Sequence, residues 1–201
     1  MDEQPMDKQR ADKQLANRPD ESPPTARPTV DRQPRPPRHK KLPFDPIDEA
    51  ARQWGRRWGA VDEMHAVTSL MRVQQLVLGQ LDEILRPHGL TFARYEALVL
   101  LTFSRAGALP LGKMGERLQV HPTSVTSIVD RLESAGLVVR RRHPEDGRAV
   151  LAEITQDGRA LVEAATADLV EARFALAGMS VEDLRRLSGL LRPVRRDAGD
   201  F

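Results

Sequence analysis

The stretch that most limits the fold of this chain runs from His121 to Leu151 and reads HPTSVTSIVDRLESAGLVVRRRHPEDGRAVL. Apolar residues recur at three- and four-residue steps until Gly136 ends the helical pattern. Two short runs containing Val and Ile follow, and the segment HPEDG between them favours a hairpin turn. The stretch therefore predicts a helix over residues 122–135 and strands over 138–142 and 149–154.

Helical periodicity also covers the segments on either side of this stretch. It predicts helices over residues 61–85, 91–106, 111–118, 155–177 and 180–191. Thr91 is expected to cap the second of these helices, and Ser180 with Asp183 resembles a capping box at the start of the last. The apolar residues expected to face inward are Met64, Val67, Leu70, Met71, Val77, Leu78, Leu81, Ile84 and Leu85 in the first helix, and Phe92, Tyr95, Leu98, Val99 and Phe103 in the second.

The order of these elements indicates the fold class. Helix, helix, short helix, helix, hairpin, long helix and helix is the order of a winged helix-turn-helix between flanking helices, in a mainly α (α+β) chain. We assign the winged domain to residues 91–154 and the flanking helices to residues 61–90 and 155–201.

The chain differs in composition before residue 61. Ten of its 15 prolines lie in residues 1–46, and so few large apolar side chains accompany them that we expect a disordered tail rich in Pro and Arg. The tail ends in a basic segment that could touch DNA non-specifically or could simply be solvated. Residues 47–60 hold both tryptophans, Trp54 and Trp58, and are expected to form a short helical segment.

Several kinds of function are disfavoured by what the sequence lacks. It has no cysteine, which removes disulfides, thiolate catalysis and thiolate metal sites, and it has no apolar run long enough to span a membrane. The five histidines are widely spaced, and no glycine-rich phosphate loop or nucleophile elbow is present. We therefore expect no metal, no cofactor and no enzymatic activity, and a cytoplasmic location.

The helix predicted over residues 122–135 has two contrasting faces. Val125, Ile128, Val129 and Leu132 share one side, whereas Thr123, Ser127 and Asp130 lie opposite them, with Ser124, Thr126 and Arg131 on the flanks. Short hydroxyl side chains let a helix lie deep in the major groove and can bond phosphates or base edges. An ordinary solvated surface helix would show the same pattern, so this feature alone leaves both interpretations open.

The hairpin that follows favours contact with DNA. Arg140, Arg141 and Arg142 place cationic charge on the first strand, and Arg148 follows Asp146 in the loop across a glycine. A carboxylate at Asp146 can hold the Arg148 guanidinium extended, and an extended arginine on a narrow hairpin fits the minor groove. Together with the hydroxyl-rich helix, the hairpin predicts a site for double-stranded DNA.

The segment LGKMGERLQVHPTSVTSIVDRLESAGLVVRRRHPEDGRAVLAEITQDGRAL closely resembles the MarR (multiple-antibiotic-resistance regulator) family of bacterial transcription factors. The likeness covers roughly residues 61–195. It implies a homodimer whose terminal helices intertwine, with two winged domains on a pseudo-palindromic duplex, and it implies the role of a repressor. The wide apolar stripes of the terminal helices agree with self-association. The chain departs from the family pattern in having His121, a further expected DNA contact, where Ser or Thr is common, and in extending before residue 61.

The resemblance also implies regulation by a small anionic or phenolic ligand bound between the dimerisation helices and the winged domain. The residues that could contact such an effector are Trp54, Trp58, His65, Arg72, Arg94 and Tyr95. Each has a simpler explanation, because Tyr95 suits a core and Arg72 and Arg94 suit a solvated surface or an interface. The thiol oxidation used in part of the family is impossible without cysteine.

Two alternatives to a ligand-responsive regulator remain at this point. One is a constitutive or architectural DNA-binding protein without an effector. The other is an enzyme whose winged domain only mediates dimerisation, which is disfavoured because too few residues remain for a catalytic domain.

Deleting residues 1–43 should leave self-association and DNA recognition intact, because a disordered tail contributes no packing to the core. Light scattering and a gel-shift titration on the shortened and complete chains would measure both properties. A monomeric shortened chain would contradict the expected disorder.

Overall fold

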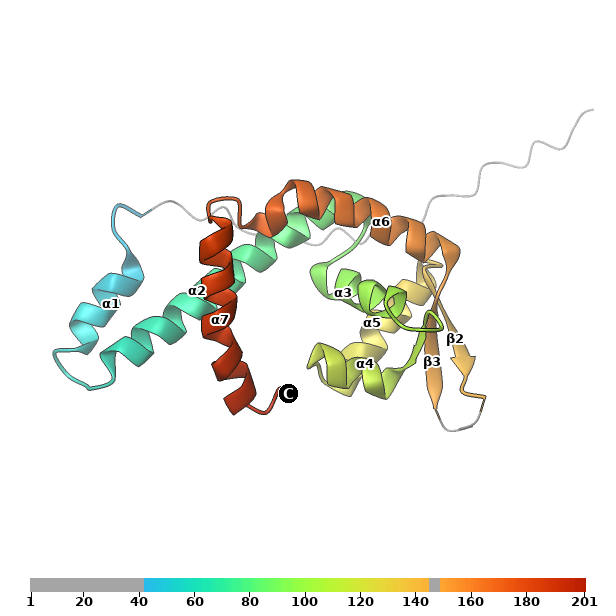
Figure 1. Cartoon of the computed structure of the whole chain (residues 1–201), viewed down its shortest axis with the longest axis horizontal. Coiled ribbons are helices and arrows are strands. Elements are labelled where there is room, and N and C mark those ends of the chain that lie inside the picture. The colour runs from blue at the N-terminus through green and yellow to red at the C-terminus, as the bar shows by residue number, and fades with distance from the viewer. Residues whose placement is uncertain (1–41, 145–148) are drawn as a thin grey trace, which may run out of the picture. The chain divides into compact units, whose positions relative to one another are not determined.

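The computed structural model describes residues 42–144 and 149–201, so the expected proline-rich tail and the wing residues Asp146 and Arg148 lie outside it. The described part is mostly helical with one small antiparallel sheet, which confirms the predicted fold class (Figure 1). Its elements are α1 (Pro46–Trp54), α2 (Val61–Leu85), η1 (Arg86–His88), α3 (Phe92–Thr102), β1 (Ala108–Pro110), α4 (Leu111–Leu118), α5 (Pro122–Ser134), β2 (Val138–Arg142), β3 (Val150–Ile154), α6 (Gln156–Glu171), η2 (Arg173–Ala175) and α7 (Val181–Asp197).

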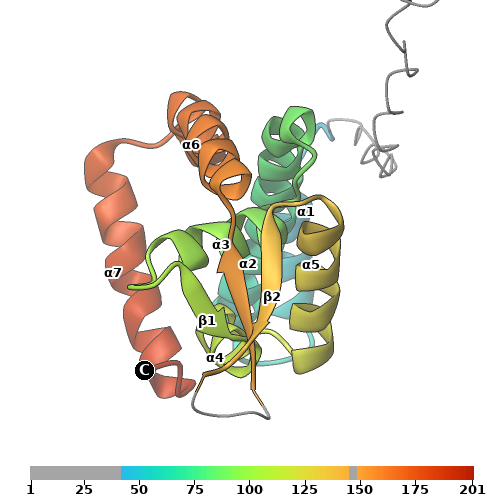
Figure 2. The same ribbon diagram turned by 90° about the vertical axis from the view of Figure 1, so that its right-hand side faces the viewer.

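The sheet has three antiparallel strands in the order β1-β3-β2 (Figure 2). The predicted hairpin is present as β2 and β3, and it pairs Val138 with Ile154 and Arg142 with Val150. Strand β1, in contrast, was not expected, since its residues fall between the helices predicted over residues 91–106 and 111–118. Three residues are too few to show an alternating pattern, and Leu109 becomes a strand residue only because Ala152 of β3 lies opposite it.

The core lies in the winged domain and under the C-terminal half of α2. Leu85, Leu98, Leu101, Met114, Val125, Val129, Leu132, Val138 and Leu169 are its largest fully buried side chains. Tyr95 is 6% exposed, and its hydroxyl lies 2.9 Å from the Thr166 hydroxyl of α6. That hydrogen bond satisfies the phenol in an apolar setting, as burial requires.

Several residues expected to face inward are exposed. Within α2 only Leu81 and Leu85 are buried, whereas Val67 and Met71 are more than half exposed. Phe103 is 82% exposed, because α3 ends at Thr102 and Phe103 is its C-cap. Periodicity predicted that apolar residues share a face, but it does not tell whether another element covers that face.

The helix predicted over residues 155–177 ends earlier than expected. Helix α6 stops at Glu171, and a left-handed turn follows in which Arg173, Phe174 and Ala175 have φ values of 50°, 50° and 61°. Such backbone costs about 1–2 kcal/mol per non-glycine residue. The Arg173 guanidinium donates hydrogen bonds to the carbonyls of Ala177 (3.1 Å) and Met179 (3.0 Å), which offsets part of this cost. No glycine at 173–175 marked the turn in the sequence.

Side-chain oxygens accept hydrogen bonds from backbone amides at the N-terminal ends of α3 and α7. The Ser180 hydroxyl accepts a hydrogen bond from the Asp183 amide at 3.1 Å, which confirms the predicted cap of α7. Thr91 is the N-cap residue of α3 but makes no side-chain cap; instead Asp82 of α2 accepts a hydrogen bond from the Phe92 amide at 2.7 Å. That bond links α2 directly to the start of α3.

A tight junction joins the wing to α6. The Thr155 hydroxyl accepts a hydrogen bond from the Gly158 amide at 3.0 Å and donates one to the Gly136 carbonyl at 2.9 Å. The Thr155 amide bonds the Leu137 carbonyl at 3.0 Å. A Cβ atom on Gly158 would overlap that carbonyl oxygen and lie 2.8 Å from Cγ1 of Ile154, so the backbones meet here only because residue 158 is glycine.

Gly158→Ala should therefore lower the free energy of unfolding by about 1–3 kcal/mol, the usual cost of forcing an extra methyl group into a packed site. Thermal and denaturant unfolding would measure the loss. Gly178→Ala is the matched control, because no atom lies within 4 Å of a Cβ there and stability should barely change. Equal stability of both variants would contradict the close approach at residue 158.

Candidate nucleic-acid interface

Helix α5 begins with a histidine cap. The His121 ring Nδ1 accepts a hydrogen bond from the Thr123 amide at 3.3 Å, and Pro122 occupies the first helical turn, where a missing N–H costs nothing. The imidazole thus caps the helix in place of the Ser or Thr that is common in the family, and it remains exposed. Its position at the N-terminal end of α5 leaves it available to a ligand that approaches this end of the helix.

The two faces of α5 separate as the sequence predicted. Val125, Val129 and Leu132 are buried and Ile128 is half-buried. The opposite surface is exposed and consists of Thr123, Ser124, Thr126, Ser127, Asp130 and Arg131. The Thr126 hydroxyl donates to the Pro122 carbonyl at 3.1 Å, whereas the hydroxyls of Ser124 and Ser127 make no hydrogen bond to the described residues. Two hydroxyls on this surface are thus available to an outside partner.

Helix α4 packs closely behind α5. Gly115 makes this possible, because a Cβ there would lie 3.2 Å from the Val120 carbonyl and 3.3 Å from Cγ2 of Val125. Gln119 ends α4 in the left-handed conformation, with φ 53°, which turns the chain sharply into α5. The α4–α5 pair is therefore a helix-turn-helix whose second helix presents its polar face to solvent.

Arg140, the first of the three arginines on β2, is half-buried against α5. Arg140 forms ion pairs with Asp130 (2.5 Å) and Glu133 of α5, and its amide donates a hydrogen bond to Glu133 at 3.0 Å. Burial acts to lower the pKa of Arg140, but hydrogen bonds to Glu133 and Asp130 outweigh it and raise the pKa. Arg140 therefore fixes helix α5 to strand β2, and its charge is less available to a ligand.

The next two arginines are more exposed. Arg141 pairs with Glu153 of the neighbouring strand but keeps 64% of its side chain exposed. Arg142, at the end of β2, is exposed and has no ion pair among residues 42–144 and 149–201. A backbone bond from His143 to Ala149 at 3.0 Å continues the hairpin beyond β2. Cationic charge available to a ligand thus rises toward the tip of the wing.

Sequence reasoning missed the carboxylates of this site. Asp130, Glu133 and Glu153 neutralise two of the three consecutive arginines. The sequence does show that Asp130 and Glu133 lie one helical turn apart on the polar side of α5. It does not show that the hairpin folds back on α5 and brings Arg140 to these two carboxylates.

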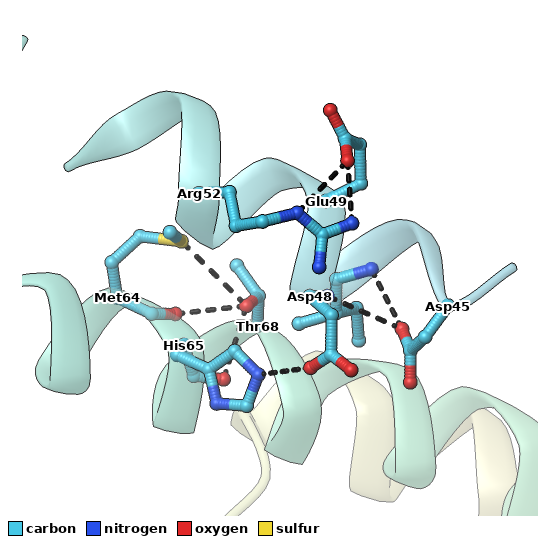
Figure 3. Close-up of polar contacts among 8 residues, drawn as sticks. Asp45, Asp48, Glu49, Arg52, Met64, His65 and Thr68 are labelled. Atoms are coloured by element: carbon cyan, nitrogen blue, oxygen red, sulfur yellow. Dashed lines mark hydrogen bonds and ion pairs between the residues drawn. The ribbon is translucent and has the colours of Figure 1, made fainter. Parts of the chain in front are cut away.

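The six residues considered for an effector site are not brought together within one chain. Tyr95 is a core residue, and Arg94 beside it donates to the Gly89 carbonyl at 3.2 Å. Far along α2, His65 pairs with Asp48 of α1 at 2.8 Å (Figure 3). The remaining three lie around α1: the rings of Trp54 and Trp58 are tilted by 55° with their centroids 4.7 Å apart, and Arg72 lines a separate hollow.

The described residues contain neither a metal-binding cluster nor a membrane-spanning helix. No group of three or more His, Cys, Asp or Glu side chains in residues 42–144 and 149–201 is placed to hold a metal ion. Within the same ranges, no helix has the length and apolar character to cross a membrane.

An exposed second helix, a bracing first helix and a cationic hairpin together define a winged helix-turn-helix DNA-binding protein. Comparison with known proteins gives the family. The MarR family model matches residues 93–150. The organic hydroperoxide resistance transcriptional regulator of Bacillus subtilis is 37% identical over 102 residues, which span 51% of this chain and 67% of that protein. The chain belongs to the MarR family of DNA-binding transcriptional regulators.

Solved structures agree with this membership. Sco5413, a MarR family transcriptional regulator from Streptomyces coelicolor, is 55% identical, with a TM-score of 0.67 over 71% of this chain and 99% of its own. A mutant MarR from Escherichia coli, complexed with operator DNA, is 25% identical, with a TM-score of 0.59 over 68% and 99% of the two chains. CouR from Rhodococcus jostii, bound to p-coumaroyl-CoA, is 30% identical, with a TM-score of 0.55 over 62% and 87%. The relatives from Bacillus subtilis and Streptomyces coelicolor are transcriptional regulators and not enzymes.

Replacing Arg140 with Ala should lower the free energy of unfolding by about 1–3 kcal/mol, because it leaves two carboxylates of the α5–β2 contact without their partner. Arg142→Ala is the matched control and should change stability by less than about 0.5 kcal/mol, as for most surface substitutions. Chemical denaturation of both variants would measure the difference. Equal losses would show that Arg140 does not brace the helix.

Proposed function

We propose that this chain acts as a homodimeric repressor that binds a pseudo-palindromic operator and is released from it by a small-molecule effector. The observation that carries the proposal is the exposed hydroxyl surface of α5 beside an arginine-bearing hairpin. A protein that reads DNA in the nucleoid would work in the cytoplasm.

Helix α5 is proposed to enter the major groove. Its outer surface holds Thr123, Ser124, Thr126 and Ser127, whose side chains are short enough for close approach and can donate to or accept from base edges. His121 and Arg131, at opposite ends of that surface, would contact phosphates and fix the position of the helix. The brace from Arg140 to Asp130 and Glu133 would keep the helix at a constant angle to the wing.

The wing of residues 138–154 is proposed to reach the minor groove. Arg142 lies at the end of β2, and Arg148, with its neighbour Asp146, follows in the connecting loop. Arginine in a narrow minor groove gains from the strong negative potential there. Arg141 keeps most of its side chain exposed despite its pair with Glu153, so it would add a phosphate contact.

Self-association is supported by apolar surface that one copy leaves uncovered. Val67, Met71, Val170, Val181, Leu190 and Val194 are each more than half exposed on α2, α6 and α7. Exposed apolar side chains of this number are costly in a monomer and are typical of a subunit interface. A symmetric pair would also present two α5 helices to the two halves of a palindromic site.

Release by an effector is the part of the proposal that rests on relatives. CouR binds p-coumaroyl-CoA, which is both anionic and phenolic, and it shares the fold and 30% of its sequence with this chain. A chain without cysteine would respond by binding such a ligand and not by thiol oxidation. The competing proposal is a constitutive DNA-binding protein. It is favoured by the fact that the six residues considered for effector binding do not lie together within one copy.

A selection of bound sequences from a random duplex library, run beside light scattering, would test the central proposal. A dimer that selects a two-fold symmetric site supports it, and a monomer that selects no sequence overturns it. Screening a metabolite panel for release of the selected duplex then distinguishes a ligand-responsive repressor from a constitutive DNA-binding protein, because only the repressor would dissociate from the duplex when its ligand is present.

Arg148→Ala should weaken binding to the selected duplex by about 1–3 kcal/mol, the value of one good groove contact. Gel-shift titration at fixed salt would measure the change. Arg86→Ala provides a control for lost charge, because Arg86 pairs with Glu83 at 3.1 Å in α2 and η1, outside the proposed interface. Unchanged affinity of the Arg148 variant would reject the role given to the wing.

Ser127→Ala should change which bases are preferred while leaving the salt dependence of binding nearly the same, because base contacts specify sequence and phosphate contacts set the salt slope. Binding of both proteins to a set of single-base operator variants would show this. A uniform loss of affinity across all variants would instead indicate that Ser127 contacts the backbone.

A further inference from the structure

Both tryptophans of the chain line one hollow at the end of α1. Trp54 is the last residue of α1, Trp58 lies in the turn that follows, and their ring centroids are 4.7 Å apart. The hollow has a volume of about 510 Å³, and the rest of its lining is Ala50, Gln53, Arg56 and Arg57. Trp58 is 56% exposed, so aromatic surface is accessible from solvent. A space of this size is typical of small-molecule sites, which occupy about 300–1,000 Å³.

The turn that carries these rings is fixed by hydrogen bonds. The amides of Arg57 and Trp58 both donate to the Trp54 carbonyl at 2.9 Å. The Trp54 indole N–H donates to the Gly59 carbonyl, also at 2.9 Å, and this bond sets the orientation of the ring. The hollow is therefore formed without a ligand, and a preformed site loses less conformational entropy when it binds one.

Two guanidinium groups at the hollow have no carboxylate partner. Neither Arg56 nor Arg57 forms an ion pair or a side-chain hydrogen bond with residues 42–144 and 149–201. Glu49 of α1 is already engaged, because it binds Arg52 at 2.5 Å (Figure 3) and Gln53 at 2.8 Å. The hollow thus combines aromatic surface with two available positive charges.

These side chains define the chemistry of a ligand. Indole rings stack against flat aromatic rings, and a guanidinium group can donate two parallel hydrogen bonds to a carboxylate. A neutral aromatic compound would use only the indoles, and a saturated acid would use only the arginines. A flat ring that carries a carboxylate would use both.

From these observations we propose that the hollow at the end of α1 is a binding site for a small planar aromatic carboxylate. The proposal concerns residues 50–58, which lie outside the winged domain and outside residues 93–150 that the family model matches. It depends neither on the homodimer nor on release from DNA, so it can fail or succeed separately from the function proposed above.

The indole N–H groups allow binding to be observed at the site itself, because the chain has only two tryptophans. The full chain, labelled with ¹⁵N, would be titrated with naphthoate and followed by NMR spectroscopy. We expect both indole signals to shift and to reach saturation, with a dissociation constant on the order of 1 mM or tighter, as is usual for a ligand of about a dozen heavy atoms. Indole signals that do not shift to saturation would overturn the proposal.

Two related compounds separate the two features of the ligand. Naphthamide keeps the rings and lacks the charge, whereas cyclohexanecarboxylate keeps the charge and lacks the aromatic rings. Each should bind at least about fivefold more weakly than naphthoate, because each loses one of the two interactions. Equal affinity for either compound would contradict the combined recognition of ring and carboxylate.

A variant tests the two arginines directly. Arg56→Ala and Arg57→Ala, made together, should weaken naphthoate binding about tenfold or more, because both donors to the carboxylate are lost. Arg105→Ala is the control for lost positive charge, since Arg105 is exposed in the turn after α3, away from the hollow. Circular dichroism would confirm that both variants keep their helices. An unchanged dissociation constant for the double variant would show that the arginines do not hold the ligand.

A single-stranded oligothymidylate distinguishes a small-molecule site from a nucleic-acid site, because nucleic acids also combine flat rings with negative charge. If it shifts both indole signals at lower concentrations than naphthoate does, the hollow serves nucleic acid and the proposal is overturned. Indole signals that stay unchanged, or that shift only at higher concentrations, support a site for a small molecule.

Discussion

The structure depends on the close contact between the start of α6 and the end of the recognition helix. Thr155 bonds both Gly136 and Leu137, and Gly158 admits the Leu137 carbonyl where any larger residue would collide with it. The contact fixes the direction in which α6 leaves the wing. Because α6 also carries Thr166, which bonds Tyr95 of α3, the same helix orients the winged domain and leads to the surfaces proposed for self-association. The start of α6 is therefore tied to the turn that follows α5 by both the amide and the hydroxyl of Thr155.

Three consecutive arginines carry out different tasks because their surroundings differ. Arg140 is drawn inward by two carboxylates of α5, Arg141 is balanced by one carboxylate of β3, and Arg142 has no such partner in the described residues. Strand alternation places Arg141 on the face opposite Arg140, where Glu153 pairs with it, whereas Arg142 shares the face of Arg140 but lies two residues further along β2, away from the residue that pairs with Asp130 and Glu133. The same residue type thus supplies rigidity at the base of the wing and available charge toward its tip.

The exposed apolar surface of α2 and α7 indicates that the chain needs a protein partner in addition to DNA. Helix α7 has a side-chain cap at Ser180 but no buried residue, and α2 has buried residues only near its C-terminal end. Helix α1 extends the uncovered surface instead of closing it, because its contacts with α2 are polar or leave a hollow. A second copy would cover both helices and would also hold two α5 helices at a fixed spacing. Association would therefore stabilise the protein and, in the same step, allow it to bind a palindromic site as proposed.

The sequence by itself determined the order and type of nearly every element, the two faces of α5 and the family resemblance, because these follow from local periodicity, caps and turns. The helix over residues 111–118 and the strand over 138–142 were predicted with their observed bounds. Only the tertiary structure decided which apolar faces are covered, so Phe103 and the N-terminal half of α2 proved exposed. It also decided that Arg140 braces the recognition helix and that α6 ends in a left-handed turn, since both depend on groups that meet only when distant segments pack together.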